Sequence, residues 1–449
     1  MTPRDLALAA LNSTDDSPGF QERYLEAAFE RNGAFDERDR AFVVHLVQGV
    51  LRWQLRLDWI IRQTVRFPFK KIEPTTLNIL RLALYQIFFM DRVPERAAVN
   101  EAVRQAGGAG HRHVTGFVNG ILRHICRHKG DVRFPDPGRE RDRYLSLSYS
   151  YPLWLVKKWI REMGSDAAER LLDAGNRIPV RVIRVNTLKT DIPGLIGQLN
   201  KEGVTASTCA FSPEGLLLED YKGPVDRLEA FGKGLFQVQG EAAQICAHVL
   251  GPRHGEAVLD VCAGLGGKST HLAALMKDGG IVLALDRSRT RLVGLSQNAK
   301  RLGVGSLLPV AGDAAGPLSS LMRMSFDRIL VDGPCSGLGV ISRHPDAKLT
   351  KREADIERLA RLQATILNQA VSLLRKGGRL LYVTCTISKE ENEGVVHRFL
   401  KRNRDMAHED LRRAVPEWVL DLIDENGFFK TLPHVHSMEG FFAASFTKM

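Results

Sequence analysis

Two cysteines stand where a thiol could do chemistry, each at the end of an apolar run. Cys335 ends Asp332-Gly-Pro-Cys335, and Cys385 lies between two threonines. A free cysteine at a strand end is more often a buried packing residue, because its side chain behaves as a small hydrophobe. Two such cysteines, one of them close to Asp332, favour a thiolate that attacks a polarised pyrimidine ring.

A glycine-containing loop predicts a second site, for a cofactor, in the stretch Asp260–Lys268 (DVCAGLGGK). The loop follows an apolar run and opens a helix. Its glycines therefore let a ligand approach the backbone, and the helix N-terminus supplies free N–H groups. Asp286 ends the next apolar run, 24 residues after Cys262. A carboxylate at that distance can bind ribose hydroxyls.

The loop pattern also limits the kind of ligand. It is neither Gly-x-Gly-x-x-Gly nor a P-loop, because Gly264 stands only two residues from Gly266. No arginine-rich phosphate grip follows it, so we expect a nucleoside without a large phosphate tail. S-adenosylmethionine, with adenine, ribose and a charged amino acid, fits this description. Asp313 could accept a hydrogen bond from the adenine amino group; alternatively, it only caps a turn.

From residue 256 onward, short apolar runs alternate with helical stretches at 290–301 and 353–374. This order predicts an α/β fold with a parallel sheet and helices on both faces, whose ligands lie at the carboxyl ends of the strands. The predicted strands are 257–262, 281–286, 307–313, 327–332 and 379–385. They end at Cys262, Asp286, Asp313, Asp332 and Cys385.

The part of the chain before residue 256 is organised differently. Apolar residues recur at helical spacing in residues 1–130, which predicts an all-α bundle with helices at 40–53, 77–89, 97–105 and 114–124. Residues 131–146 are charged and contain two prolines, so we expect a linker. Residues 147–250 predict a small α+β connector, with helices at 154–163 and 193–202 and strands at 180–186 and 215–220. Residues 251–449 form the α/β domain.

Composition limits the class of protein. The chain has 449 residues, which at roughly 100–200 residues per domain predicts two or three domains. No apolar run reaches the ~18–20 residues of a membrane span, and the N-terminus is a poor signal peptide, so the cytoplasm is expected. The net charge of +11 favours RNA or DNA as partner. The six cysteines form no Cys-x-x-Cys pair, and we predict no metal site.

Several longer segments resemble known families. The C-terminal half resembles the RNA cytosine-carbon-5 methyltransferases, and the N-terminal helices resemble the NusB antitermination fold. The methyltransferase segments are RVNTLK (184–189), VQGEAAQ (238–244), VCAGLGGKSTHL (261–272), ALDRS (284–288), GDA (312–314), VDGPCSGLGVISRHPDAK (331–348), YVTCTISKEENE (382–393) and EGFFAASFTK (439–448). The NusB-like segments are ERDRAFVVHLVQGVLR, ILRLALYQI, AAVNEAV and GFVNGILRH. Together they are similar to the bacterial family that methylates 16S ribosomal RNA.

This resemblance implies a role for each candidate residue. Cys385 is the nucleophile, Cys335 assists product release, and Asp332 stabilises the base. The target is a cytosine of 16S ribosomal RNA, at position 967 in the usual rRNA numbering. The S-adenosylmethionine site consists of Cys262, Ala263, Gly264, Leu265, Gly266, Gly267, Lys268, Asp286, Asp313 and Asp332. The family usually has Ala-Pro where this chain has Gly264-Leu265, so we expect a less pre-organised loop.

Three alternatives stay open at this point. The same chemistry could act on transfer RNA or on large-subunit rRNA. The chain could instead be a non-catalytic RNA-binding factor similar to antitermination proteins, although the two cysteines argue against this. A nicotinamide oxidoreductase is disfavoured, because the phosphate-binding glycine pattern is missing.

Overall fold

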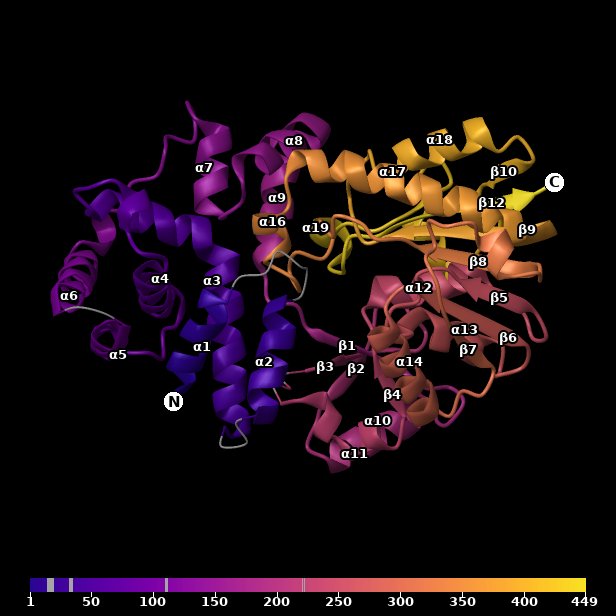
Figure 1. Cartoon of the computed structure of the whole chain (residues 1–449), viewed down its shortest axis with the longest axis horizontal. Helices are drawn as coiled ribbons and strands as arrows, with labels where there is room; N and C mark the ends of the chain where they lie inside the picture. Colours follow the sequence, from indigo (N-terminus) through magenta and orange to yellow (C-terminus); the bar gives the residue numbers. More distant parts are fainter. Residues whose placement is uncertain (14–19, 32–34, 110–111, 220, 222) are drawn as a thin grey trace. The chain divides into compact units, whose positions relative to one another are not determined.

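The computed structural model describes residues 1–13, 20–31, 35–109, 112–219, 221 and 223–449 (Figure 1). The chain forms two compact units. The first consists of Met1–Arg177 and Ile341–Lys351, and the second consists of Ile178–Val340 and Arg352–Met449. The sheets lie in the second unit and the first is helical, as the sequence predicts. The domain boundaries that we set at 130, 146 and 250 stay a prediction.

The first unit is a helical bundle whose longest helix, α3, begins at the N-cap Asp36 and runs for 28 residues. Its core contains fully buried side chains from α1, α3, α4, α5 and α6. An ion pair between Arg81 and Asp58 (2.7 Å) joins α4 to α3. The helices are α1 (Pro3–Asn12), α2 (Phe20–Arg31), α3 (Glu37–Thr64), η1 (Phe69–Lys71), α4 (Pro74–Phe89), α5 (Glu95–Ala109), α6 (Arg112–Arg127), α7 (Arg141–Ser148), α8 (Leu153–Met163), α9 (Ser165–Asn176) and α16 (Ala347–Thr350).

Part of the predicted linker is helical, which corrects the sequence prediction for residues 141–146. These residues begin α7, where Leu145 is fully buried and the Ser146 hydroxyl donates to the Tyr151 carbonyl oxygen (2.6 Å). The many charged residues of this stretch obscured its two buried positions, Leu145 and Ser146. The segment Ile341–Lys351 also joins the helical unit, and in it Lys348 donates to Asn176 (2.9 Å).

The connector sheet has the antiparallel order β2-β3-β1-β4. Its elements are β1 (Arg181–Val185), α10 (Ile192–Lys201), β2 (Ala206–Thr208), β3 (Gly215–Leu218), α11 (Glu229–Gly232) and β4 (Phe236–Val238). The predicted end of the second strand, Asp220, lies outside the described residues. Arg184 of β1 donates to the Gly267 carbonyl oxygen (2.7 Å), and Asn186 donates to that of Leu302 (2.7 Å). These bonds join the connector to the larger sheet's helices.

The larger sheet has the order β10-β12-β9-β8-β5-β6-β7, and β11 pairs with β12. The five predicted strands are parallel to one another. The elements are α12 (Glu241–Leu250), β5 (Ala257–Asp260), α13 (Gly267–Leu275), β6 (Ile281–Asp286), α14 (Arg289–Leu302), β7 (Leu307–Ala311), α15 (Leu318–Leu321), β8 (Phe326–Asp332), α17 (Glu353–Ala370), β9 (Leu374–Thr384), α18 (Glu393–Arg402), β10 (Met406–Glu409), β11 (Phe429–Lys430), α19 (Pro433–His436) and β12 (Phe442–Lys448).

The antiparallel edge of this sheet was not predicted. Strand β12 pairs antiparallel with β9, and β10 and β11 pair with β12. The sequence of β12, FAASFTK, contains Ser and Thr and no Val, Ile or Leu, so it lacks the apolar run by which the parallel strands were predicted. The sheet is therefore mixed, and β9 is covered on its outer side.

Successive residues of the parallel strands face opposite cores, as the two-residue period of a strand requires. In β5, Val258 packs with α12, α13 and α14, and Leu259 packs with α15 and α17. Figure 1 shows α17 and α18 on one face of the sheet and α12, α13 and α14 on the other. Because both faces are covered, a ligand has access to the sheet only at its ends. Among the described residues, no helix is long and apolar enough to cross a membrane.

Candidate active site

The strand order places the candidate residues at one end of the sheet. From β5 the chain proceeds to β6 and β7 on one side, and then to β8 and β9 on the other. The strand order thus reverses between β5 and β8, where an open α/β sheet forms its ligand crevice. The glycine loop follows β5, and Asp332 ends β8.

Asp286, at the end of β6, fixes the glycine loop. One carboxylate oxygen accepts the backbone N–H of Gly264 (2.9 Å), and the other accepts that of Ser288 (2.8 Å). Gly264 and Gly266 have φ values of +58° and +80°, which favour glycine, and Gly266 is the N-cap of α13. Each oxygen of Asp286 keeps a free lone pair, so the carboxylate can still accept from a ligand hydroxyl.

Asp313 lies at the end of the neighbouring strand β7 and caps a turn. Its carboxylate accepts the backbone N–H of Ala315 (2.9 Å), and the side chain is exposed. The backbone N–H of Gly312 donates to the Asp286 carbonyl oxygen (3.1 Å), so the ends of β6 and β7 are adjacent. Asp313 is therefore near the glycine loop and also has the turn-capping role that the sequence left open.

Lys268 contacts the residue that ends β8. Its Nζ lies 2.6 Å from Oδ2 of Asp332, and the side chains are 12% and 27% exposed. Burial is the largest single influence and lowers the pKa of Lys268, but the charge and hydrogen bond of Asp332, together with the nearby Cys246 and Cys385, raise this pKa above its usual range. The lysine is therefore a permanent cation. It joins the glycine loop to the neighbouring Asp-Gly-Pro-Cys segment.

The two cysteine thiols touch. Sγ of Cys335 and Sγ of Cys385 lie 3.1 Å apart, although 50 residues separate them in the chain. The hydrogen bond with Cys385, together with burial, raises the pKa of Cys335 well above its usual range. A protonated Cys335 can therefore donate a hydrogen bond to the sulfur of Cys385. Close packing of Gly339 against Gly440, and a hydrogen bond from the Gly339 N–H to the Cys385 carbonyl oxygen (3.0 Å), support this contact.

Asp260, the last residue of β5, was not among the predicted site residues. It is 1% exposed; Oδ2 accepts the Ser269 hydroxyl (2.7 Å), and Oδ1 has no hydrogen-bond partner among the described residues. Burial raises the pKa of Asp260 to about 6. The acidic end of the first strand could have indicated it in the sequence.

Asp260→Asn is expected to stabilise the apo protein in a pH-dependent way. The raised pKa means that the folded state holds a proton that the unfolded state has lost, so stability falls as pH rises from about 4 to 6. Asparagine removes this pH dependence. The free energy of unfolding of the variant should therefore exceed that of the wild type by roughly 3 kcal/mol above about pH 6, and by little below about pH 4. Urea unfolding at a series of pH values measures the gain. Asp421→Asn, an exposed matched change, should show none, and an equal gain at every pH would contradict the assignment.

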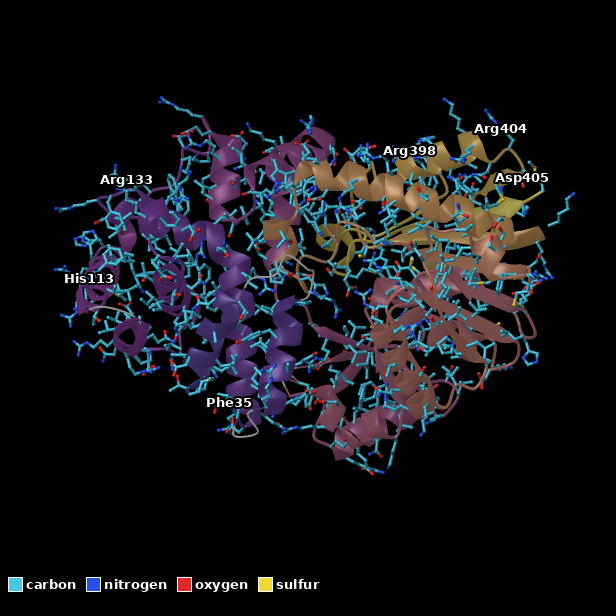
Figure 2. All side chains as sticks on the ribbon, viewed as in Figure 1. Phe35, His113, Arg133, Arg398, Arg404 and Asp405 are labelled. Atoms are coloured by element: carbon cyan, nitrogen blue, oxygen red, sulfur yellow. The ribbon has the colours of Figure 1, made fainter. Side chains whose placement is uncertain are left out.

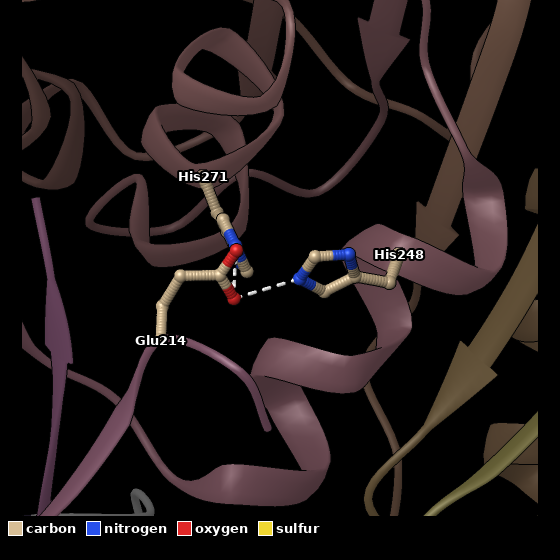
Figure 3. Close-up of side chains that lie close together, drawn as sticks. All are labelled: Glu214, His248 and His271. Atoms are coloured by element: carbon tan, nitrogen blue, oxygen red, sulfur yellow. Dashed lines mark hydrogen bonds and ion pairs between the residues drawn. The ribbon is translucent and has the colours of Figure 1, made fainter. Parts of the chain in front are cut away.

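A second polar group lies between the connector and α13. Figure 3 shows Glu214 with His248 and His271; Glu214 Oε2 is 2.8 Å from Nε2 of His248 and 3.9 Å from that of His271. Such a group resembles a metal site. However, the buried Arg184 guanidinium interacts electrostatically with Glu214 and with His271, whose pKa burial and Arg184 lower. A cation of the protein already balances the carboxylate, and we assign no metal here.

Three family profiles match successive parts of the chain. The NusB family matches residues 1–127, a ferredoxin-like domain of RsmF/B-like methyltransferases matches 151–226, and the 16S rRNA methyltransferase RsmB/F family matches 247–447. A Bacillus subtilis protein described as a probable ribosomal RNA small subunit methyltransferase B is 36% identical and aligns over 99% of this chain and 98% of its own. A Synechocystis protein of the same description is 34% identical over both full lengths.

Two solved structures support the same relationship. The crystal structure of PH0851 has a TM-score of 0.82, 27% identity and coverage of 100% of this chain and 99% of its own. The structure of NSun6 from Pyrococcus horikoshii with SFG has a TM-score of 0.57 and 28% identity, and covers 65% of this chain and 97% of its own.

The fold and these matches define the class: a ribosomal RNA methyltransferase with an N-terminal NusB domain and a ferredoxin-like connector. The full-length relatives then identify the family, and the chain belongs to the ribosomal RNA small subunit methyltransferase B (RsmB) family. The resemblance predicted from the sequence is confirmed at this level.

Proposed function

We propose that the chain transfers a methyl group from S-adenosylmethionine to carbon 5 of a cytosine in 16S ribosomal RNA, at position 967, through a covalent cysteine adduct. The observation that carries the proposal is the contact between the two thiols, 3.1 Å apart. The chemistry needs one cysteine to attack and a second to assist release at the same base. Ribosomal RNA as the substrate places the enzyme in the cytoplasm.

The residues at the ends of β5 and β6 fit the cofactor. The glycine loop presents backbone N–H groups, Asp286 can accept from ribose hydroxyls, and the unpartnered Oδ1 of Asp260 can accept from an ammonium group. Asp313 stays a proposed contact for the adenine amino group. When bound, S-adenosylmethionine supplies the electrophilic methyl group. The seven residues 262–268 form the loop against which it lies.

Cys385 is the proposed nucleophile, because its Thr-Cys segment resembles the one from which the RNA cytosine-carbon-5 methyltransferases attack. The Cys385 thiolate adds to ring carbon 6 and makes carbon 5 nucleophilic toward the methyl group. Negative charge develops toward ring nitrogen 3 and the carbonyl oxygen. The Lys268–Asp332 pair (2.6 Å) lies within electrostatic range of both cysteines and is suited to stabilise this charge. The target base must first leave any helix that it occupies.

Release of the methylated base from Cys385 requires Cys335. While Cys385 is a free thiol or thiolate, their hydrogen bond is the largest cause that raises the pKa of Cys335. Adduct formation turns Cys385 into a thioether, which removes this cause. Cys335 can then lose its proton to solvent and take the proton from carbon 5. The electrons of that C–H bond reform the ring double bond and expel the Cys385 thiolate.

Asp286→Ala is expected to weaken S-adenosylmethionine binding by at least about tenfold, since it removes a charged acceptor from a partly desolvated site. The structure adds a second reason, because Asp286 also holds the Gly264 amide. Asp286→Asn keeps one carbonyl acceptor and should lose less affinity. Isothermal calorimetry with the full chain measures both variants. Unchanged affinity in Asp286→Ala would remove the residue from the cofactor site.

The proposed target is tested by bisulfite sequencing of total RNA from a strain that lacks the gene, with the complemented strain as control. The expected result is the loss of one methylcytosine in 16S rRNA. Loss of a methylcytosine in transfer RNA or in large-subunit rRNA would support the alternative substrates. No lost methylcytosine at all would support the non-catalytic RNA-binding factor.

A further inference from the structure

Two neighbouring side chains before α18 contact the cysteine-bearing segments: Asn392 contacts that of Cys385, and Glu391 contacts mainly that of Cys335 but also the Thr386 hydroxyl. Glu391 and Asn392 are 0% and 1% exposed. The chemistry proposed above uses neither of them. Buried carboxylate and amide groups need hydrogen-bond partners, and theirs come from the residues that flank the two cysteines.

Glu391 holds the segment that carries Cys335. Its Oε1 accepts the backbone N–H of Ser336 (2.8 Å), and its Oε2 accepts the Ser336 hydroxyl (2.5 Å). Gln363 of α17 donates both to Oε1 of Glu391 (3.0 Å) and to the Pro334 carbonyl oxygen (2.9 Å). Both residues next to Cys335 are thus tied to this carboxylate, one directly and one through Gln363.

Asn392 holds the segment that carries Cys385. The Thr384 hydroxyl donates to Oδ1 of Asn392 (2.6 Å), and Nδ2 of Asn392 donates to the Thr386 carbonyl oxygen (3.0 Å). These threonines are the two neighbours of Cys385. The Thr386 hydroxyl also forms a hydrogen bond with that of Ser336 (2.8 Å), so the two segments meet at this point.

We propose that Glu391 and Asn392 are positioning residues with separate tasks: Glu391 holds Cys335 for breakdown of the covalent adduct, and Asn392 holds Cys385 for attack. This inference rests on the proposed function. Attack forms the bond between Sγ of Cys385 and ring carbon 6. Breakdown transfers the carbon-5 proton to Cys335, reforms the ring double bond and breaks that bond. A shift of about 1 Å in a reacting group can slow a step on the order of a hundredfold, so each loss should slow one step.

Glu391→Ala is the test of the first task. The full-length variant is incubated with S-adenosylmethionine and a 16S rRNA transcript, and adducts are resolved on a denaturing gel. A methylated adduct is expected to accumulate, with breakdown slowed at least about tenfold. Glu391→Gln should restore release, because its amide can accept from the Ser336 N–H and donate to the Ser336 hydroxyl. Burial raises the pKa of Glu391, so a neutral side chain suits the position.

Asn392→Ala is tested in a Cys335→Ala background, where the adduct persists and its formation rate can be measured. The double variant should form the adduct at least about tenfold more slowly than Cys335→Ala alone.

Glu390→Gln is the matched control for the Glu391 variants. It changes the neighbouring glutamate, whose side chain accepts from the Ser388 hydroxyl (2.7 Å) and not from Ser336. It should release product at the wild-type rate.

Three results would overturn the inference. In the first, Cys335→Ala traps an adduct but Glu391→Ala traps none. In the second, Glu391→Gln or Glu390→Gln traps as much adduct as Glu391→Ala, which would make the effect unspecific. In the third, Asn392→Ala leaves the rate of adduct formation unchanged. Failure of Cys335→Ala itself to trap an adduct would instead overturn the proposed role of Cys335 in release, and the separate tasks with it.

Discussion

Cys385→Ala is expected to reduce methyl transfer by a factor on the order of 10³ or more and to form no covalent RNA adduct. The variant lacks the thiolate that adds to the ring, and a residue that acts as nucleophile is rarely replaced by its neighbours. Cys335 lies 3.1 Å away, but its proposed role is release of the product and not attack. Methyl transfer from labelled S-adenosylmethionine and a denaturing gel measure the two effects.

Cys335→Ala is the matched variant at the same contact. It should attack and methylate but fail to release, and therefore accumulate a protein–RNA species that survives denaturation. If one cysteine is only a packing residue, its loss should cost ~1 kcal/mol of stability without changing the chemistry. An adduct from Cys385→Ala and none from Cys335→Ala would reverse the assignment. An active, adduct-free Cys385→Ala enzyme would exclude attack from that position.

Neutralising a basic segment of the helical unit is expected to lower RNA affinity at least about tenfold. The segment comprises four exposed residues at the end of α3, in the turn that follows and in η1: Arg62, Arg66, Lys70 and Lys71. No acidic residue occurs from 59 to 72. The Arg62 guanidinium lies 4.2 Å above the Phe69 ring, and Phe67 is 41% exposed, which suits phosphate binding and base stacking. His113 and Arg133 also project from this unit (Figure 2).

The fourfold alanine variant of this segment should also reduce the slope of log affinity against log salt by up to about 3, because each lost phosphate contact removes about 0.7. The control neutralises four exposed residues that form ion pairs: Arg177, Lys233, Arg358 and Arg361. This control variant loses the same positive charge, but its slope of log affinity against log salt should stay unchanged. Equal affinity and slope in both variants would mean that this segment does not hold RNA.

Deleting residues 1–130 is a less direct test of the same point. The Arg56 guanidinium donates to the Ser148 carbonyl oxygen (3.1 Å), and the backbone N–H of Leu55 donates to the Ser150 hydroxyl (3.0 Å). The deletion would therefore remove partners of residues that remain in the chain. A loss of RNA affinity could then come from misfolding, which the point variants avoid.

Most of the parallel sheet was predictable, because each strand combines an apolar run with a polar last residue. The same rule indicated Asp286, Asp313, Asp332 and the two cysteines, since the carboxyl ends of neighbouring parallel strands share one edge. Strand β12 was missed because Ser and Thr interrupt its apolar residues, and it contains no Val, Ile or Leu. The helix α7 was missed because charge dominates its sequence.

The sequence predicted most of the site residues, but it did not predict the contacts that these residues make with one another. Lys268 was assigned to the cofactor loop, and only the fold shows that its Nζ meets Asp332. Asp260 was passed over although it ends a strand. Glu391 and Asn392 follow the Thr-Cys segment by a few residues, and their roles depend on where α18 begins. Spacing along the chain cannot give the contacts of Lys268 and Glu391, because their partners lie 64 and 55 residues away in sequence.

The most direct test of the central claim is the identity of the methylated nucleoside. The purified full-length chain is incubated with methyl-labelled S-adenosylmethionine and 16S rRNA, and the digested RNA is analysed by mass spectrometry. The proposed mechanism predicts label in 5-methylcytidine at one position, and no label in the Cys385→Ala variant. Label on another nucleoside, on the exocyclic nitrogen of cytidine, or undiminished in Cys385→Ala would contradict it.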